Sequence, residues 1–218
     1  MSTQITTLFT PCMLTAVNND INIIVGYKRN KFKNEKLKYF YNKEFKDNNI
    51  LESLFCAKKS IKGNCLISYS DIIFKKDVVE RLMKSKSNIS IVVDTEWKKN
   101  YKGRTQHPIS QAENVFFNKN LILKNIGKNL KEKESNGEFI GMLKLNSKGA
   151  KIFQQYYKKA KDNFKKANFY NAKNIKKAYL TDFFQYLINS KIRIKCTLIK
   201  NNWMEIDTVQ DYRRAKNF

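Results

Sequence analysis

The sequence contains no run of about 18 apolar residues, and its first residues lack the basic stretch and apolar core of a secretion signal. We therefore expect a cytoplasmic protein with no membrane span. The four cysteines are scattered without a C-x-x-C pair, which indicates neither a zinc site nor disulfides. Glycine is scarce, with seven in 218 residues, and none precedes Gly26. No shift in composition divides the chain, so we expect a single domain over residues 1–218.

Positive charge is abundant, with 43 Lys and Arg against 19 Asp and Glu, a formal net charge of +24. However, lysine far exceeds arginine, and Asn, Ile, Tyr and Phe are frequent, as an A+T-rich coding sequence would produce. No arginine-rich arm, aromatic RNA-binding motif or zinc-finger spacing accompanies the charge. We expect a general attraction for anionic nucleotides and phosphorylated metabolites, and no dedicated nucleic-acid binding.

Apolar stretches of strand length alternate with segments of helical periodicity, which is the layout of an α/β sheet flanked by helices. Strands are predicted at 20–27, 37–41, 65–69, 89–93, 138–145 and 192–199, and a hairpin at 113–117 and 121–126. Helices are predicted at 51–59, 75–86 and 147–160 and after Thr181 and Thr208. The helix at 75–86 joins two strands into a β-α-β unit, which favours parallel strands.

Three segments are less regular. Residues 12–17 are interpreted as the remnant of a helix, 97–111 as a charged loop outside the core, and 163–177 as a polar linker. The loop holds His107, the only histidine, and a single loop histidine lies on the solvated surface more often than it acts in catalysis. In the last helix, Tyr212 and Ala215 are expected to face inward.

Carboxylates follow several predicted strands. Asp71 ends the strand at 65–69, Asp94 ends the next one, and Asp207 follows a short strand that begins at Trp203. Open α/β sheets bind ligands at the carboxyl ends of strands, and Mg²⁺ needs only a few protein oxygens beside phosphate and water. The alternative role for Asp71 or Asp207 is to cap the helix that follows it. If the two lie in one sheet, they form a magnesium site able to brace a triphosphate.

The sequence resembles a known family along roughly nine-tenths of its length, from Asp20 to the end. Five motifs, in order, are similar to the nucleotidyltransferase domain that follows phosphoenolpyruvate mutase in phosphonate biosynthesis: GNCLISYSDIIF, ISIVVDTEW, NGEFIGMLKLNSKGA, YLTDFFQYLINSKIRI and WMEIDTVQDYRRA. INIIVGYK and WMEIDTVQDYR also resemble choline-phosphate cytidylyltransferases. The chain is therefore identified as a member of the nucleotidyltransferase (cytidylyltransferase) family.

The resemblance implies a Rossmann-like α/β sheet of the nucleotide-diphospho-sugar transferase type, mixed but mostly parallel. It implies core β-α-β units at 20–95, a part covering the acceptor at 96–180, and a return to the core sheet at 181–218. It further implies that a phosphate or phosphonate oxygen attacks the α-phosphate of CTP and releases pyrophosphate. Asp71 and Asp207 match the two aspartates that hold the catalytic Mg²⁺, although Ser70-Asp71 stands where the family usually has Gly-Asp.

Other matches to the family are looser. Asn42, Asn49 and Ser53 match the polar stretch beside the nucleotide and acceptor. Glu138 and Asp182 match the part that covers the acceptor, where a carboxylate meets a substrate ammonium such as that of 2-aminoethylphosphonate or choline. Asp182 has an alternative role, compensating the dipole in the first turn of its helix.

The family also opens with a strand and a glycine-rich loop that grips the base and triphosphate through backbone amides and nearby cations. No glycine precedes Gly26, so the sequence is interpreted as N-terminally truncated, and we expect this chain alone to bind CTP poorly. The alternatives are an inactive relative or one that depends on a partner chain, and a sugar-phosphate nucleotidyltransferase. The nucleotide base and the acceptor stay open.

Overall fold

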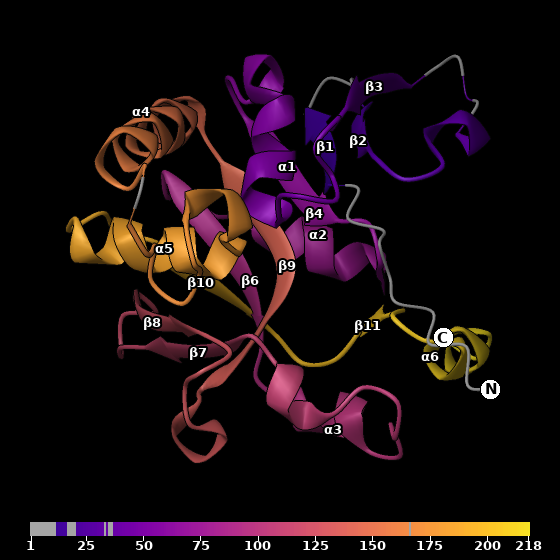
Figure 1. Ribbon diagram of the computed structural model, residues 1–218. Coiled ribbons are helices and arrows are strands. Elements are labelled where there is room, and N and C mark those ends of the chain that lie inside the picture. Colours follow the sequence, from indigo (N-terminus) through magenta and orange to yellow (C-terminus); the bar gives the residue numbers. More distant parts are fainter. Residues whose placement is uncertain (1–11, 17–20, 33, 35–36, 166) are drawn as a thin grey trace.

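The computed structural model describes residues 12–16, 21–32, 34, 37–165 and 167–218. A mixed sheet flanked by helices forms its centre (Figure 1). Seven strands follow one path across the sheet, in the order β10 (Lys195–Ile199), β6 (Ile89–Asp94), β9 (Gly137–Leu145), β4 (Cys65–Tyr69), β1 (Cys12–Ala16), β2 (Ile21–Val25) and β3 (Lys38–Tyr41). The predicted hairpin, β7 (Asn114–Phe117) and β8 (Leu123–Gly127), joins β9 through β7.

The directions of the strands agree with the mixed α/β fold expected from the sequence. β4 and β6 both pair antiparallel with β9, so they run parallel to each other with β9 between them. The predicted β-α-β unit is therefore parallel, but its strands are not neighbours. Five of the seven strands point the same way, namely β2, β3, β4, β6 and β10, while β1 and β9 run opposite to them.

The helices cover both faces of the sheet, because alternate residues of each strand point to opposite sides. The larger apolar cluster packs three helices on one face: α1 (Ile50–Cys56), α4 (Ser147–Asn163) and α5 (Leu180–Asn189). On the other face α2 (Lys76–Met83) buries Val78 and Leu82 against Val92 of β6 and Met142 of β9. No helix among the described residues is long and apolar enough to cross a membrane.

A second, two-stranded sheet continues directly from β4. Ser70 and Asp71 separate β4 from β5 (Ile72–Phe74), and β5 pairs antiparallel with β11 (Trp203–Glu205) near the end of the chain. The last helix, α6 (Val209–Ala215), follows β11. This small sheet brings the segment after β11 beside the end of the central strand.

Three sequence predictions about irregular segments are wrong. Residues 12–16 form a strand and not a helix, because β2 and β4 both pair with them. The loop at 97–111 contains α3 (Lys98–Tyr101), and its Trp97 and Tyr101 are buried with Ala112 in a separate small core. The linker at 163–177 buries Phe169 and Ile175 in the main core. In α6, Tyr212 is 59% exposed and does not face inward.

Candidate active site

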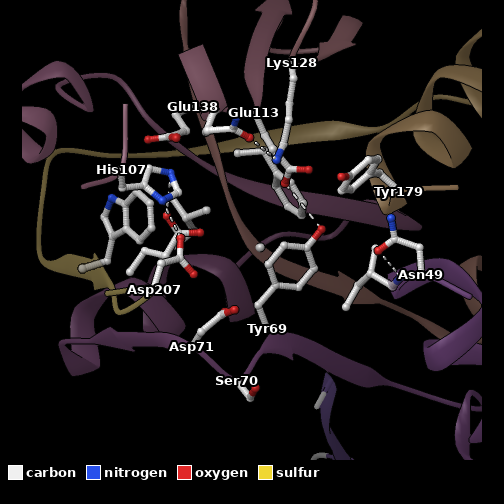
Figure 2. A pocket seen from close by; sticks show the side chains of 17 residues that line it. Asn49, Tyr69, Ser70, Asp71, His107, Glu113, Lys128, Glu138, Tyr179 and Asp207 are labelled. Atoms are coloured by element: carbon white, nitrogen blue, oxygen red, sulfur yellow. Dashed lines mark hydrogen bonds and ion pairs between the residues drawn. The ribbon is translucent and has the colours of Figure 1, made fainter. Parts of the chain in front are cut away.

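A cavity of about 180 Å³ lies where β4 and β9 meet the small second sheet. Figure 2 shows its two ends: His107, Asp207 and Asp71 lie at one, and Asn49 and Tyr179 lie at the other. We call these the aspartate end and the tyrosine end.

The aspartate end is built on the pairing of β5 with β11. The backbone N–H of Ile206 donates to the carbonyl oxygen of Asp71 over 2.7 Å, which extends this pairing past Glu205. Asp71 and Asp207, separated by 136 positions in the sequence, therefore lie side by side in one cavity. Neither caps a helix: Lys75 is the N-cap of α2, and the Thr208 hydroxyl caps α6.

The carboxyl group of Asp71 has surroundings that suit a metal ligand. Burial, and then the charge of Asp207, raise the pKa of Asp71 to about 6. Its Oδ1 atom is buried and has no hydrogen-bond partner among the described residues. A divalent cation would satisfy this oxygen and offset the repulsion between the two carboxylates, so the donor set fits Mg²⁺.

Two more side chains, His107 and Glu205, share the aspartate end. His107 Nδ1 lies 2.7 Å from Asp207 Oδ2, and its Nε2 lies 3.6 Å from Glu205 Oε2. Burial raises the pKa of Asp207, but the hydrogen bond and charge of His107 outweigh it, so the pKa lies below its ordinary value. Burial and the charge of Asp207 raise the pKa of Glu205. The expectation that His107 is solvated surface is wrong, because its side chain is only 15% exposed.

A buried ion pair holds this end together. Arg104, in the loop before His107, donates from Nε and Nη2 to the two carboxylate oxygens of Asp211. The same Asp211 carboxylate accepts hydrogen bonds from the backbone N–H groups of Asp207 and Thr208, at 3.3 and 3.1 Å. The loop that carries His107 is thereby fastened to the turn that carries Asp207.

Between the two ends lie two glutamates, the partly exposed Glu113 and the buried Glu138. Burial raises the pKa of Glu113 to about 7 and that of Glu138 to about 8. Tyr101 donates a hydrogen bond to Oε1 of Glu138, and Oε2 is buried with no partner among the described residues. Glu113 accepts from the hydroxyls of Tyr69 and Thr181, both at 3.4 Å. Two carboxyl groups so placed provide a site for a cationic group of a ligand.

The tyrosine end adds a cation and aromatic rings. Lys128 Nζ lies 4.9 Å from the centre of the Tyr179 ring and 3.1 Å from Oε1 of Gln111. Its charge lowers the pKa of Glu113, although burial of that group prevails. Asn49, which caps α1 through its side chain, also lines the cavity here.

The structure brings four of the seven predicted site residues into the cavity: Asp71, Asp207, Asn49 and Glu138. Asn42 and Ser53 lie outside its lining and hydrogen bond to each other at 2.8 Å. Asp182 is also outside, in the first turn of α5 where the dipole alternative places it, and its oxygens accept from the backbone of Tyr179 and from Asn171. The roles of all seven in binding or catalysis stay predictions.

Asp94, the other acidic strand end, belongs to the scaffold. Its carboxylate is fully buried and accepts hydrogen bonds from the backbone of Glu96 and Asn201 and from the Trp203 indole. Both oxygens of Asp94 are occupied by these partners, and Asp94 lies outside the cavity lining that contains Asp71. Sequence reasoning also missed Glu113, which directly precedes β7. In the sequence Glu113 is a single acidic residue beside an apolar strand, and this pattern is too common to indicate a functional site.

Comparisons with known proteins find one relative by sequence and several by fold. The chain is 29% identical over 205 residues to the CTP:phosphoglutamine cytidylyltransferase of Campylobacter jejuni, covering 88% of the chain and 79% of that protein. Among solved structures, the inositol-1-phosphate CTP transferase of T. maritima superposes with a TM-score of 0.61 at 17% identity, covering 86% of this chain and 70% of that one. The CTP:phosphocholine cytidylyltransferase of Streptococcus pneumoniae gives 0.61 at 18% identity, covering 91% and 78%. No protein-family model matches the chain.

The mixed sheet and the acidic cavity at the end of its central strand define a nucleotidyltransferase-like α/β protein. The chain is similar to cytidylyltransferases in sequence and in fold, as the sequence motifs indicated.

Proposed function

We propose that the chain transfers CMP from CTP to a small acceptor that carries a phosphate or phosphonate group, with release of pyrophosphate. The observation that carries this proposal is the meeting of Asp71 and Asp207 in one cavity. The name of the Campylobacter relative specifies CTP, and so do the names of the two solved structures, each with a different phosphorylated partner. The shared nucleotide supports CTP, and the different partners leave the acceptor to be argued from the cavity.

In this proposal Asp71 and Asp207 hold Mg²⁺, which when bound neutralises the triphosphate and polarises its α-phosphorus. The acceptor oxygen attacks that phosphorus, a new P–O bond forms, and the bond to the β-phosphate breaks. Arg104 and Asp211 keep the loop of His107 and the turn of Asp207 in register during this step. Because the cavity walls are built on the sheet, the two reacting groups are held in place before reaction.

The glutamates favour an acceptor that carries an ammonium group. Glu138 is buried and Glu113 partly so, and this burial raises the pKa of each, which disfavours their charged forms. An ammonium placed between them would supply a partner for these forms, and the Tyr69 and Tyr179 rings would contact its methylene or methyl groups. Aminoethylphosphonate, phosphocholine and phosphorylated amino acids all meet this description.

A second candidate is a relative of these enzymes that needs a partner chain to bind nucleotide. Calorimetry of Mg²⁺ and CTP with the isolated chain separates the two candidates. Saturable binding at micromolar affinity would contradict the partner-dependent candidate, and binding only on addition of another chain would support it.

A coupled assay of pyrophosphate release tests the proposed reaction. CTP, UTP, ATP and GTP would each be paired with phosphocholine, 2-aminoethylphosphonate, 2-hydroxyethylphosphonate and glucose 1-phosphate. We expect release with CTP, and about tenfold faster turnover for acceptors with an ammonium than for hydroxyethylphosphonate. A preference for glucose 1-phosphate would favour a sugar-phosphate nucleotidyltransferase instead. No release with any pair, despite binding of CTP, would refute the proposal.

A further inference from the structure

His107 brings an imidazole ring to the aspartate end of the cavity, beside the two aspartates. It stands in the loop between α3 and β7, and its ring lies 6.0 Å from that of Tyr101. Both ring nitrogens face carboxylates: Nδ1 faces Asp207 at 2.7 Å, and Nε2 faces Glu205 at 3.6 Å. A histidine that merely fills surface space would not be held between two acids in a partly buried cavity.

The spacing of these groups suits a shared metal ion. One ligand atom each from His107, Glu205 and Asp207 lies within 4.8 Å of the others. In an octahedral shell with bonds of about 2.1 Å, adjacent ligands are about 3 Å apart and opposite ligands about 4.2 Å apart. The pair of His107 Nδ1 and Asp207 Oδ2, at 2.7 Å, is already close to the adjacent spacing, and Glu205 lies within the 4.8 Å limit of the group. At the same end of the cavity, Asp71 Oδ1 is buried with no partner among the described residues.

We infer that His107 binds the catalytic metal ion directly through Nδ1, so that this site is a mixed nitrogen and oxygen site that prefers Mn²⁺ to Mg²⁺. The inference rests on the proposed function, since it concerns the ion of that same site. Binding replaces the hydrogen-bonding proton between His107 and Asp207, and that proton leaves to solvent. The ion then has four protein ligands, one each from Asp71, Asp207, His107 and Glu205.

The preference follows from the chemistry of the donors. Mg²⁺ favours oxygen ligands and holds them in a strict octahedron, whereas imidazole suits the transition metals. A site made of the two aspartates alone would offer only oxygen ligands and would bind Mg²⁺ and Mn²⁺ with little preference. An imidazole in the first coordination sphere raises the affinity for Mn²⁺ without a matching gain for Mg²⁺.

His107 is the only histidine in the sequence, which makes a spectroscopic test decisive. The chain would be prepared without a histidine tag, loaded with Mn²⁺ in the absence of nucleotide, and examined by electron spin-echo envelope modulation. We expect a ¹⁴N coupling from a directly bound imidazole, which changes to that of ¹⁵N when the protein carries ¹⁵N-histidine. Titration of Mg²⁺ into the same Mn²⁺-loaded samples should show that Mn²⁺ binds at least about tenfold more tightly than Mg²⁺.

Two variants complete the design. His107→Gln should lose the nitrogen coupling and about tenfold of the Mn²⁺ affinity, with Mg²⁺ affinity changed less than about threefold. His107→Asp restores a charged oxygen ligand and should bring the Mn²⁺ to Mg²⁺ ratio close to one. Circular dichroism and thermal unfolding would establish that both variants are folded.

Mn²⁺ bound to the wild-type chain without nitrogen coupling would overturn the inference and leave the aspartate site of the proposed function intact. Absence of Mn²⁺ binding would also overturn it. The pyrophosphate assay decides the proposed function separately, since it measures turnover with Mg²⁺ and does not depend on nitrogen ligation.

Discussion

The guanidinium of Arg104 contacts both carboxylate oxygens of Asp211, at 2.7 and 2.8 Å, and the two side chains are 4% and 1% exposed. This pair joins the loop of His107 to the helix that follows Asp207. The stability of the active site therefore depends on an interaction that lies just outside the cavity lining.

Removing one partner of this pair should destabilise the protein strongly. Arg104→Gln leaves the Asp211 carboxylate buried without its cation, and we expect a loss of about 3–5 kcal/mol in the free energy of unfolding. Urea denaturation would measure it. The double variant Arg104→Met with Asp211→Leu removes both charges and should recover much of the loss. A change below about 1 kcal/mol in Arg104→Gln would contradict the structural role of the pair.

Glu113→Gln tests the acceptor end. The substitution keeps the shape of the side chain and removes the negative charge that would meet an acceptor ammonium. We expect KM for an ammonium-bearing acceptor to rise about 10–100-fold, with KM for CTP almost unchanged. Steady-state kinetics with each substrate varied in turn would separate the two effects.

The control for that experiment is Glu134→Gln, since the Glu134 side chain is 65% exposed and lies on a surface turn. It should leave both KM values unchanged. Equal effects of the two substitutions would show that Glu113 does not recognise the acceptor.

The raised pKa of Glu138 predicts that the stability of the protein depends on pH. The pKa of Glu138 is about 8 in the folded protein, against 4.5 for an ordinary glutamate, because burial disfavours the charged form. Between these pH values the folded state binds the proton more tightly, so stability is highest below about pH 4.5 and falls as the pH rises toward 8. In Glu138→Gln this loss is absent. Denaturation at about pH 5 and pH 9 should show the variant gaining on the order of 2–4 kcal/mol relative to wild type.

Parallel stability curves for wild type and Glu138→Gln would mean that Glu138 titrates normally. Because the two proteins are compared at each pH, the titration of groups that do not interact with Glu138 cancels.

Gly141 is needed where β9 passes Tyr69. Its φ is +79°, and a Cβ there would lie 2.3 Å from Cδ2 of the Tyr69 ring. Gly141→Ala should therefore cost about 2 kcal/mol or more and displace Tyr69 from Glu113. Gly63→Ala is the matched control, because Gly63 has a φ of +65° but nothing within 4 Å of its Cβ position. We expect it to cost only about 1 kcal/mol. Equal losses in thermal unfolding would contradict the packing argument.

Much of the sheet was predictable because its strands follow a clear apolar pattern. The strand at Cys65–Tyr69, the helix after it and the strand at Ile89–Asp94 all form as expected. The pattern did not reveal that β9 inserts between the two strands, since their partner comes about 50 residues later. Residues 12–16 were misread because a short apolar stretch has no diagnostic period, and pairing with β2 and β4 decides its structure.

The site was predictable only where a motif marked it. Asp71 and Asp207 end strands that the sequence identified, and the structure places them together. His107 and Glu113 lacked such a mark. The position of His107 depends on Arg104 and Asp211, which are 107 residues apart in the sequence and show no local pattern. Long-range ion pairs of this kind cannot be inferred from spacing.

The central claim is that Asp71 and Asp207 together hold the metal ion for cytidylyl transfer, and the turnover of Asp71→Asn and Asp207→Asn tests it most directly. Pyrophosphate release from CTP should fall about 1,000-fold or more in each, because a neutral amide neither offsets the ion's charge nor matches its affinity. Asp162→Asn, at a side chain that is 57% exposed, should release pyrophosphate at the wild-type rate. Near-wild-type turnover by either active-site variant would contradict the account.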